Sequence, residues 1–192
     1  MKHSIKKIAI ALIATLSLSY CHAQKKYTNG MINANKKTYA VKEMPSGKNV
    51  SITSIANKYT NEGMSKHFHG KFQGKVYPEM IGTTIDENKL KAILMEEIGA
   101  ANMVKMAQDY RNFLTIHLTF SLDGIPLEVA FFTNNNTLIT PQVFEKIEAR
   151  IKDEIHATFK ETVRPGFDRP FYRYYDFIRY DVDYYYNKIV EN

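Results

Sequence analysis

The feature that most constrains the fold is a pair of β-rich runs that flank Asp123 and Gly124. Asp-Gly is preferred in two-residue type I′ hairpin turns, because both turn positions need a positive φ. With that turn, the opposed pairs on one face are all apolar: Leu122 with Ile125, Phe120 with Leu127, Leu118 with Val129, and Ile116 with Phe131. A slip of one residue would destroy this match. The sequence therefore predicts a hairpin over residues 113–133 with one buried face.

A helix is predicted before the hairpin, starting near Asp86. Thr84 and Glu87 have the spacing of a capping box. Apolar residues then recur at helical intervals: Leu90, Ile93, Leu94, Ile98 and Ala101. Gly99 is expected to end or bend this helix.

A second helix is predicted after the hairpin, with Thr140 as N-cap and Pro141 in the first turn. Its apolar stripe consists of Phe144, Ile147, Ile151, Ile155 and Phe159. It should end by Arg164, before Pro165. We expect an α+β fold, in which a small antiparallel sheet containing the central Asp-Gly hairpin packs against two amphipathic helices.

Residues 1–23 have the pattern of a cleavable signal peptide. Lysines without acids precede an apolar run over 8–18, and the small residues Cys21 and Ala23 then favour cleavage before Gln24. The run is shorter than the roughly 20 residues that span a bilayer. We therefore expect an exported protein, periplasmic or secreted, with no integral membrane segment after cleavage. The alternative is a lipoprotein anchored through Cys21, although Tyr20 is bulky for that motif.

Removal of this segment takes away three lysines and no acids, which lowers the formal net charge from +6 to +3. A charge this small, with both signs interspersed, argues against nucleic-acid binding. Cys21 is the sole cysteine, so the mature chain has no disulfide. No motif calls for a cofactor.

The mature chain is expected to consist of a flexible lead over 24–48, with at most one strand near 38–41, and a single domain over 49–192. The lead is rich in Lys, Asn and Gly. Asn49 to Ile55 suits a short half-buried strand.

The C-terminal segment over 167–186 is the compositional outlier, because half of its twenty residues are aromatic. A helical stripe and a strand both fit its apolar spacing. The strand interpretation places Ile178, Tyr180, Val182, Tyr184 and Tyr186 on one face, and these residue types favour strands.

Tyrosine and arginine suit contacts with a protein partner or a sugar ring. The candidate binding residues are Arg173, Arg179, Tyr180 and Tyr184. The competing interpretation is that the rings complete the core and the arginines pair with nearby aspartates.

The order of helix, Asp-Gly hairpin, Pro-capped helix and late strand resembles the many small exported proteins of unknown function in Gram-negative bacteria. It is also loosely similar to the C-terminal domain of TonB proteins. The similarity is one of pattern over residues 84–186, and Tyr77-Pro78 is the counterpart of a characteristic Tyr-Pro motif. The resemblance implies an α+β interaction domain with no known chemistry.

Histidines supply the candidate chemistry. His67 and His69 would project from the same face of a strand, as two metal ligands could, but no third ligand is identifiable and no metal site is predicted. His117 and Glu128 could form a general-base pair on the polar side of the hairpin. No nucleophile motif accompanies them.

Our main hypothesis is a non-catalytic exported domain that binds an envelope or extracellular protein, a peptide or a glycan, through a sheet edge or the tyrosine-rich face. One alternative is a hydrolase that uses His67, His69 or His117 with a carboxylate such as Glu128. Another is a structural component of an envelope assembly. The sequence leaves the oligomeric state open.

Overall fold

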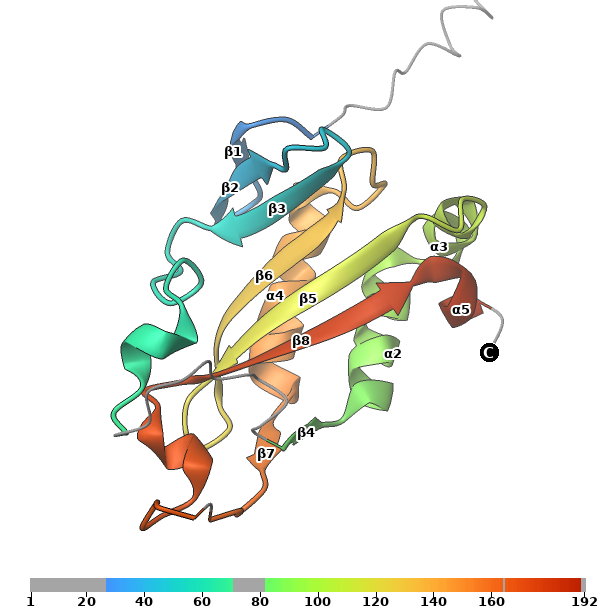
Figure 1. The fold of residues 1–192 in the computed structure, drawn as a ribbon. Helices are drawn as coiled ribbons and strands as arrows, with labels where there is room; N and C mark the ends of the chain where they lie inside the picture. The colour runs from blue at the N-terminus through green and yellow to red at the C-terminus, as the bar shows by residue number, and fades with distance from the viewer. Residues whose placement is uncertain (1–26, 71–81, 164, 191–192) are drawn as a thin grey trace, which may run out of the picture.

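The computed structural model describes residues 27–70, 82–163 and 165–190. Its centre is a six-stranded sheet in which every neighbouring pair is antiparallel (Figure 1). In spatial order the strands are β1 (Gly30–Asn33), β2 (Thr38–Glu43), β3 (Asn49–Ser54), β6 (Pro126–Asn134), β5 (Phe113–Phe120) and β8 (Ile178–Tyr185). Two short strands, β4 (Thr83–Ile85) and β7 (Ala157–Phe159), form a separate pair.

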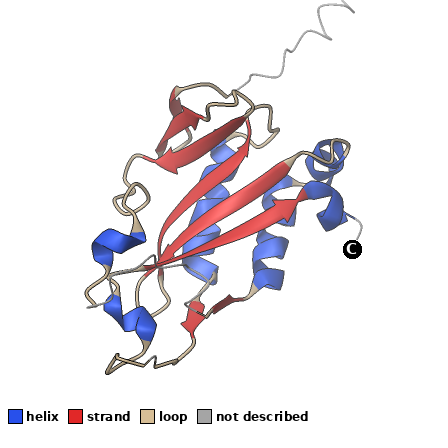
Figure 2. Cartoon of the chain, viewed as in Figure 1, coloured by secondary structure: helices blue, strands red, loops and turns tan. Residues whose placement is uncertain are grey.

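The main helices lie on one face of the sheet and leave the other face without helical cover (Figure 2). They are α2 (Glu87–Ile98), α3 (Ala100–Ala107) and α4 (Pro141–Glu154). A short α5 (Tyr186–Val190) follows β8, and the 3₁₀ turns η1 (Met64–His67) and η3 (Phe171–Tyr174) lie outside the sheet. No helix in the described part of the chain is long and apolar enough to cross a membrane. The expected α+β class with a mostly antiparallel sheet is confirmed.

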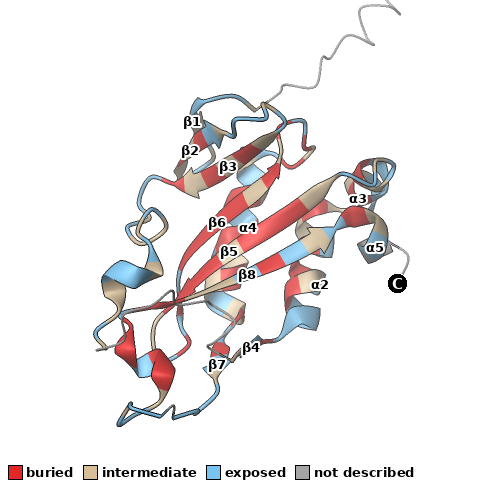
Figure 3. Ribbon diagram, in the orientation of Figure 1, coloured by how far each residue is buried: buried red, intermediate tan, exposed pale blue. Residues whose placement is uncertain are grey.

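The core lies between the sheet and these helices (Figure 3). Alternate residues of β5 are fully buried, as are the α4 residues that face them. These buried side chains are Leu114, Ile116, Leu118, Phe120, Phe144, Ile147 and Ile151. The alternation with a period of two in β5 thus separates a core face from an outer face.

The hairpin register agrees with the prediction away from the turn and differs at the turn. Ile116 lies opposite Phe131 and Leu118 opposite Val129, as expected. Phe120, however, pairs with Pro126 after a register shift, so the pairs predicted nearer the turn are wrong. Among the described residues only glycines have a positive φ, which excludes a type I′ turn at Asp123.

The turn is shaped by contact with the chain that follows α4. Gly124 has a φ of 81°, and a Cβ built on it would lie 1.9 Å from the carbonyl oxygen of Ala157. The amide of Ala157 donates to the carbonyl of Gly124 at 2.9 Å. Only glycine fits this close approach.

The predicted helices are corrected at their ends. Asp86, and not Thr84, caps α2, with its carboxylate accepting from the amide of Lys89. Gly99 has a φ of 80° and separates α2 from α3, so one predicted helix is two. Thr140 caps α4 as expected, but this helix ends at Glu154 because residues 157–159 pair with β4.

The flexible lead expected over 24–48 is wrong for the residues that the structure describes. Strands β1 and β2 belong to the sheet and are attached to α4 by two carboxylates. Glu145 accepts hydrogen bonds from the amides of Asn35 and Lys36, both at 2.8 Å. The fully buried Tyr39 donates its hydroxyl to the buried Glu148 at 2.8 Å. The predicted signal peptide over 1–23 lies outside the described residues.

The strand prediction for the C-terminal segment is correct for β8. Around it, residues 171–174 are 3₁₀ and residues 186–190 are helical. A second, smaller core consists of Phe171, Tyr172 and Tyr175 with Ile178, the first residue of β8. Part of the aromatic segment therefore completes a local cluster, and β8 completes the main sheet.

Candidate functional site

The face of the sheet without helices carries polar side chains on its last two strands. Thr115, His117 and Thr119 of β5 lie opposite Asp183, Asp181 and Arg179 of β8. Thr115 donates its hydroxyl to Asp183 at 2.6 Å. His117 Nδ1 lies 2.9 Å from Asp181 Oδ1. We call these six residues the open-face rows, because they alternate along β5 and β8 with the residues that face the main core. Thr115 and Thr119 are nevertheless buried.

One end of the open-face rows is bordered by the turn over residues 57–60, which a buried carboxylate holds. Glu128 of β6 is 5% exposed and accepts hydrogen bonds from the amides of Lys58, Tyr59 and Thr60. The hydroxyl of Thr60 adds a bond of 2.8 Å. Several donors on one carboxylate satisfy the charge that burial would otherwise penalise. Glu128 is therefore a structural anchor.

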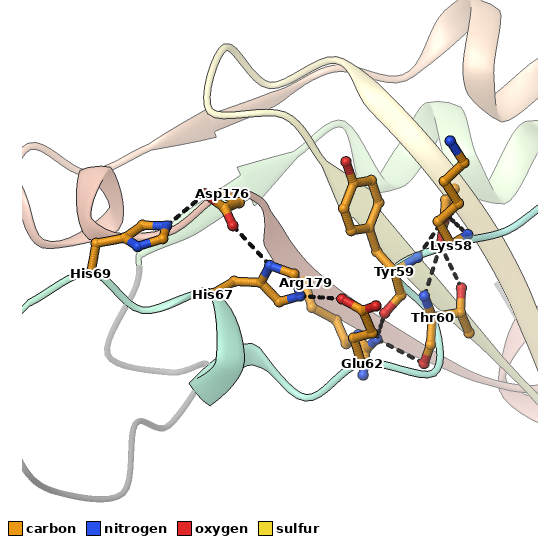
Figure 4. A network of polar contacts seen from close by, with 9 residues as sticks. Lys58, Tyr59, Thr60, Glu62, His67, His69, Asp176 and Arg179 are labelled. Atoms are coloured by element: carbon orange, nitrogen blue, oxygen red, sulfur yellow. Dashed lines mark hydrogen bonds and ion pairs between the residues drawn. The ribbon is translucent and has the colours of Figure 1, made fainter.

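Arg179 holds the same turn from β8 (Figure 4). Its Nη2 donates to the carbonyl oxygens of Tyr59 at 3.2 Å and Thr60 at 3.0 Å. This candidate binding residue thus has an internal role, and its donors at Nη2 are directed at the protein itself.

A chain of alternating carboxylates and imidazoles continues from this turn (Figure 4). His67 Nε2 lies 2.6 Å from Glu62, and its Nδ1 lies 2.8 Å from Asp176 Oδ2. His69 Nε2 lies 2.6 Å from Asp176 Oδ1. The hydrogen bonds from His67, and then from His69, hold the pKa of Asp176 below its ordinary value. This chain joins η1 to the segment that leads into β8.

The histidines do not form the sites considered from the sequence. His67 and His69 share Asp176, and no group of three or more His, Cys, Asp or Glu side chains within the described ranges is placed to hold a metal. His117 contacts Asp181 and not Glu128, so the general-base pair of His117 with Glu128 that the sequence allowed does not form. The reason is that Glu128 is already occupied by the turn over 57–60.

Tyr180 and Tyr184 project to the opposite face from Arg179. Leu118 lies opposite Tyr180 and Leu114 opposite Tyr184, and both tyrosines pack against the main core. Tyr180 donates its hydroxyl to Glu87 of α2 at 3.1 Å. The hydroxyl of Tyr184 is buried and has no partner within the described residues, and this burial raises the pKa of Tyr184.

Arg173 lies apart from β8, in η3. Its Nε donates to the hydroxyl of Tyr172 at 3.3 Å, and its guanidinium lies 3.6 Å from Glu161. The four candidate binding residues therefore fall on two faces of β8 and on η3, and they do not form one cluster. Alternation along β8 predicts the separation of Arg179 from the tyrosines.

The two edges of the sheet differ in length. β8 spans eight residues and pairs only with β5, so its outer edge carries no strand in the described part of the chain. β1, at the other edge, spans four residues. A hollow of about 690 Å³ adjoins β1 and is lined by residues 27–33 and 137–142. Neither this hollow nor the one over residues 109–113 and 134–136 includes His67, His69 or His117.

Among the described residues, these features define an α+β domain with one helical face, one face without helices and a long edge strand that pairs on one side only. A solved structure shares this fold. No protein-family model matches the chain, and no curated protein sequence is significantly similar to it. The crystal structure of a DUF5043 family protein from Bacteroides uniformis is similar to the chain, with a TM-score of 0.64. The two are 14% identical, and the match covers 86% of this chain and 96% of that one. The likeness concerns the fold alone.

Proposed function

We propose that this chain is a non-catalytic binding domain that accepts an extended segment of a partner protein along β8. The proposal rests on the outer edge of this eight-residue strand, with which no strand of residues 27–70, 82–163 or 165–190 pairs. An edge strand presents backbone N–H and C=O groups, and an extended segment satisfies them by adding one strand to the sheet. Such binding requires no special side chains, which agrees with the lack of a catalytic motif.

The β8 edge suits this role better than the β1 edge. Natural proteins protect sheet edges by keeping edge strands short, and β1 has only four residues. β8 is twice as long and contains no proline, so each of its outward-directed amides, at every second residue, can donate to an added strand. The neighbouring elements also hold β8 firmly, because it pairs with β5 along all eight residues.

The setting of the proposed interaction follows from the predicted leader over 1–23. An exported chain would meet its partner in the periplasm or outside the cell, and a lipoprotein would meet it at the membrane surface. The resemblance in pattern to the TonB C-terminal domain, which implies an interaction domain, also supports this proposal. Its Tyr77-Pro78 counterpart lies outside the described residues. A glycan remains the alternative ligand, and an envelope assembly is the alternative role.

The hydrolase alternative depends on His117 and Asp181, which form a 2.9 Å pair on the open face. Within the described residues, no serine or threonine hydroxyl is hydrogen-bonded to His67, His69 or His117. Water would therefore have to be the nucleophile. Hydrolysis of esters that is lost in His117→Ala would favour this alternative. A rate equal to that of buffer would count against it.

The experiment for the main proposal is a selection of extended peptides on the purified protein, followed by proline substitution in β8. Adjacent residues of a strand direct their N–H groups to opposite edges. Of Asp181→Pro and Val182→Pro, one therefore breaks pairing with β5, and the other removes an outward N–H together with its own side chain. Asp181→Ala and Val182→Ala, which keep the N–H, are the matched controls. Circular dichroism and urea unfolding identify the variant that stays folded. That variant should lose the selected peptides, and undiminished binding would contradict the proposal.

A further inference from the structure

Resting on this proposed function, we infer that β8 selects a partner segment with basic residues at alternate positions. The inference comes from the charge on the open-face side of the free edge. Asp181 and Asp183 are both exposed there, two residues apart on the same face. They are the two acidic residues of β8, and a strand added at its outer edge would lie beside both of them.

Each aspartate has one oxygen turned toward the sheet. Asp181 Oδ1 contacts His117, and Asp183 Oδ1 accepts from Thr115. In the described part of the chain, the second oxygen of each carboxylate makes no such contact with β5. These oxygens are therefore able to accept from a lysine or arginine on a strand added beyond β8.

The positive group nearest to these aspartates on β8 does not neutralise them. Arg179 directs its Nη2 to the carbonyls of Tyr59 and Thr60, at 3.2 and 3.0 Å. The acidic pair thus faces the edge, even though the chain without the predicted leader keeps a formal net charge of +3. A basic partner must be attracted by this local pair against the net charge of the protein.

The core-facing side of β8 determines which residues of the partner segment fit between the basic ones. Tyr180, Val182 and Tyr184 lie there, beside the main core. Residues of the added strand alternate between the two faces, so every second residue would lie beside these side chains. The segment that fits has basic residues at positions i and i+2 and apolar or aromatic residues between them.

The same charges disfavour a second copy of this chain as the occupant. Two antiparallel β8 strands related by a twofold axis at Val182 would place Asp181 opposite Asp183 of the other copy. An axis at either aspartate would place that aspartate opposite itself. Like charges directly opposite one another are destabilising in a sheet. A basic segment of a different protein is the occupant that this edge favours.

The test compares three extended peptides that share valine and tyrosine at alternate positions and carry Lys, Gln or Glu between them. Fluorescence anisotropy at low salt should show the Lys peptide binding about tenfold more tightly than the Gln peptide, and the Glu peptide weakest. In the double variant Asp181→Asn and Asp183→Asn, the Lys peptide should fall to the affinity of the Gln peptide. The exposed pair Asp153→Asn and Glu161→Gln is the matched control and should keep the preference.

If the double asparagine variant unfolds, a variant with the charge of both aspartates reversed provides the same test. Asp181→Lys with Asp183→Lys should prefer the Glu peptide. Equal binding of all three peptides by the unmodified protein would overturn the inference and leave the proposed function standing. Failure of every peptide to bind would overturn the proposed function itself. A dimer that the peptides dissociate would name a second copy as the occupant and so also overturn the inference.

Discussion

Glu128 and Arg179 hold opposite polar groups of one turn. The carboxylate accepts from the amides of residues 58–60, and the guanidinium donates to the carbonyls of Tyr59 and Thr60. The two side chains come from β6 and β8, which are not neighbours in the sheet. This turn therefore ties the long free edge to the interior of the sheet.

Glu128→Gln should lower the free energy of unfolding by about 2–4 kcal/mol, because a buried carboxylate with several donors is lost. Arg179→Met should cost about 1–2 kcal/mol, since its acceptors are partly accessible to water. Because both act on one turn, the double variant should lose less than the sum of the two. Urea unfolding of the four proteins measures this coupling. Strict additivity would show that the two residues act independently.

Tyr180 and Tyr184 should respond in opposite directions to removal of the hydroxyl. Tyr184→Phe should raise the free energy of unfolding by up to about 1 kcal/mol, because its buried hydroxyl has no partner in the described residues. Tyr180→Phe should lower it by about 0.5–1 kcal/mol through loss of the bond to Glu87. Thermal unfolding measures both. Destabilisation by Tyr184→Phe would contradict the prediction and would indicate that the hydroxyl of Tyr184 makes a hydrogen bond.

Glu148 should be the strongest link between the N-terminal strands and α4. It is fully buried and contacts Lys37 at 2.6 Å, Lys152 at 2.9 Å and the hydroxyl of Tyr39. Burial alone would raise the pKa of Glu148, but the hydrogen bonds from Lys37, Lys152 and Tyr39 outweigh it and lower the pKa. Glu148→Ala should cost about 3–5 kcal/mol. The exposed Asp153→Asn on the same helix is the control and should change stability by less than about 0.5 kcal/mol.

Asp176 should make part of the stability of the protein sensitive to acid. Its pKa is lowered in the folded state from an ordinary value of 3.8. The stabilisation is therefore present above that value and is lost as the pH falls through the folded pKa. The difference in unfolding free energy between the native protein and Asp176→Asn should be largest near about pH 5 and shrink toward about pH 2. A difference that stays constant over this acid range would contradict the prediction.

The parts of the fold that follow from local pattern were predictable. The apolar pairs Ile116 with Phe131 and Leu118 with Val129 define the register, and Thr140 with Pro141 defines the start of α4. These signals come from adjacent runs of the sequence or from neighbouring residues, so no contact with a distant segment is needed to interpret them.

The predictions that were wrong concern parts of the fold that depend on contacts between residues distant in the sequence. The turn at Asp123 departs from type I′ where Gly124 meets Ala157, more than thirty positions later. The lead was expected to be flexible because it is rich in Lys, Asn and Gly. Its order depends instead on Glu145 and Glu148 of α4, which bind the backbone after β1 and the Tyr39 hydroxyl of β2. No local pattern reports that a charged residue will be buried by a segment far away in the sequence.

The four candidate binding residues do not form one site, for a related reason. Composition singled out the tyrosines and arginines, but strand alternation places Arg179 and Tyr180 on opposite faces of β8. The free edge itself could not be predicted, because the order of strands in a sheet is set by long-range pairing. The sequence did contain the acidic alternation of Asp181 and Asp183, and only the position of β8 at the edge makes it significant.

Hydrogen–deuterium exchange of the protein, measured with and without the Lys peptide, tests the binding edge. We expect slower exchange in β8, at the alternate amides directed away from β5, with little change in β1 and in residues 109–113. Slower exchange confined to β1, or to the loops around residues 109–113, would contradict the assignment of the binding edge to β8.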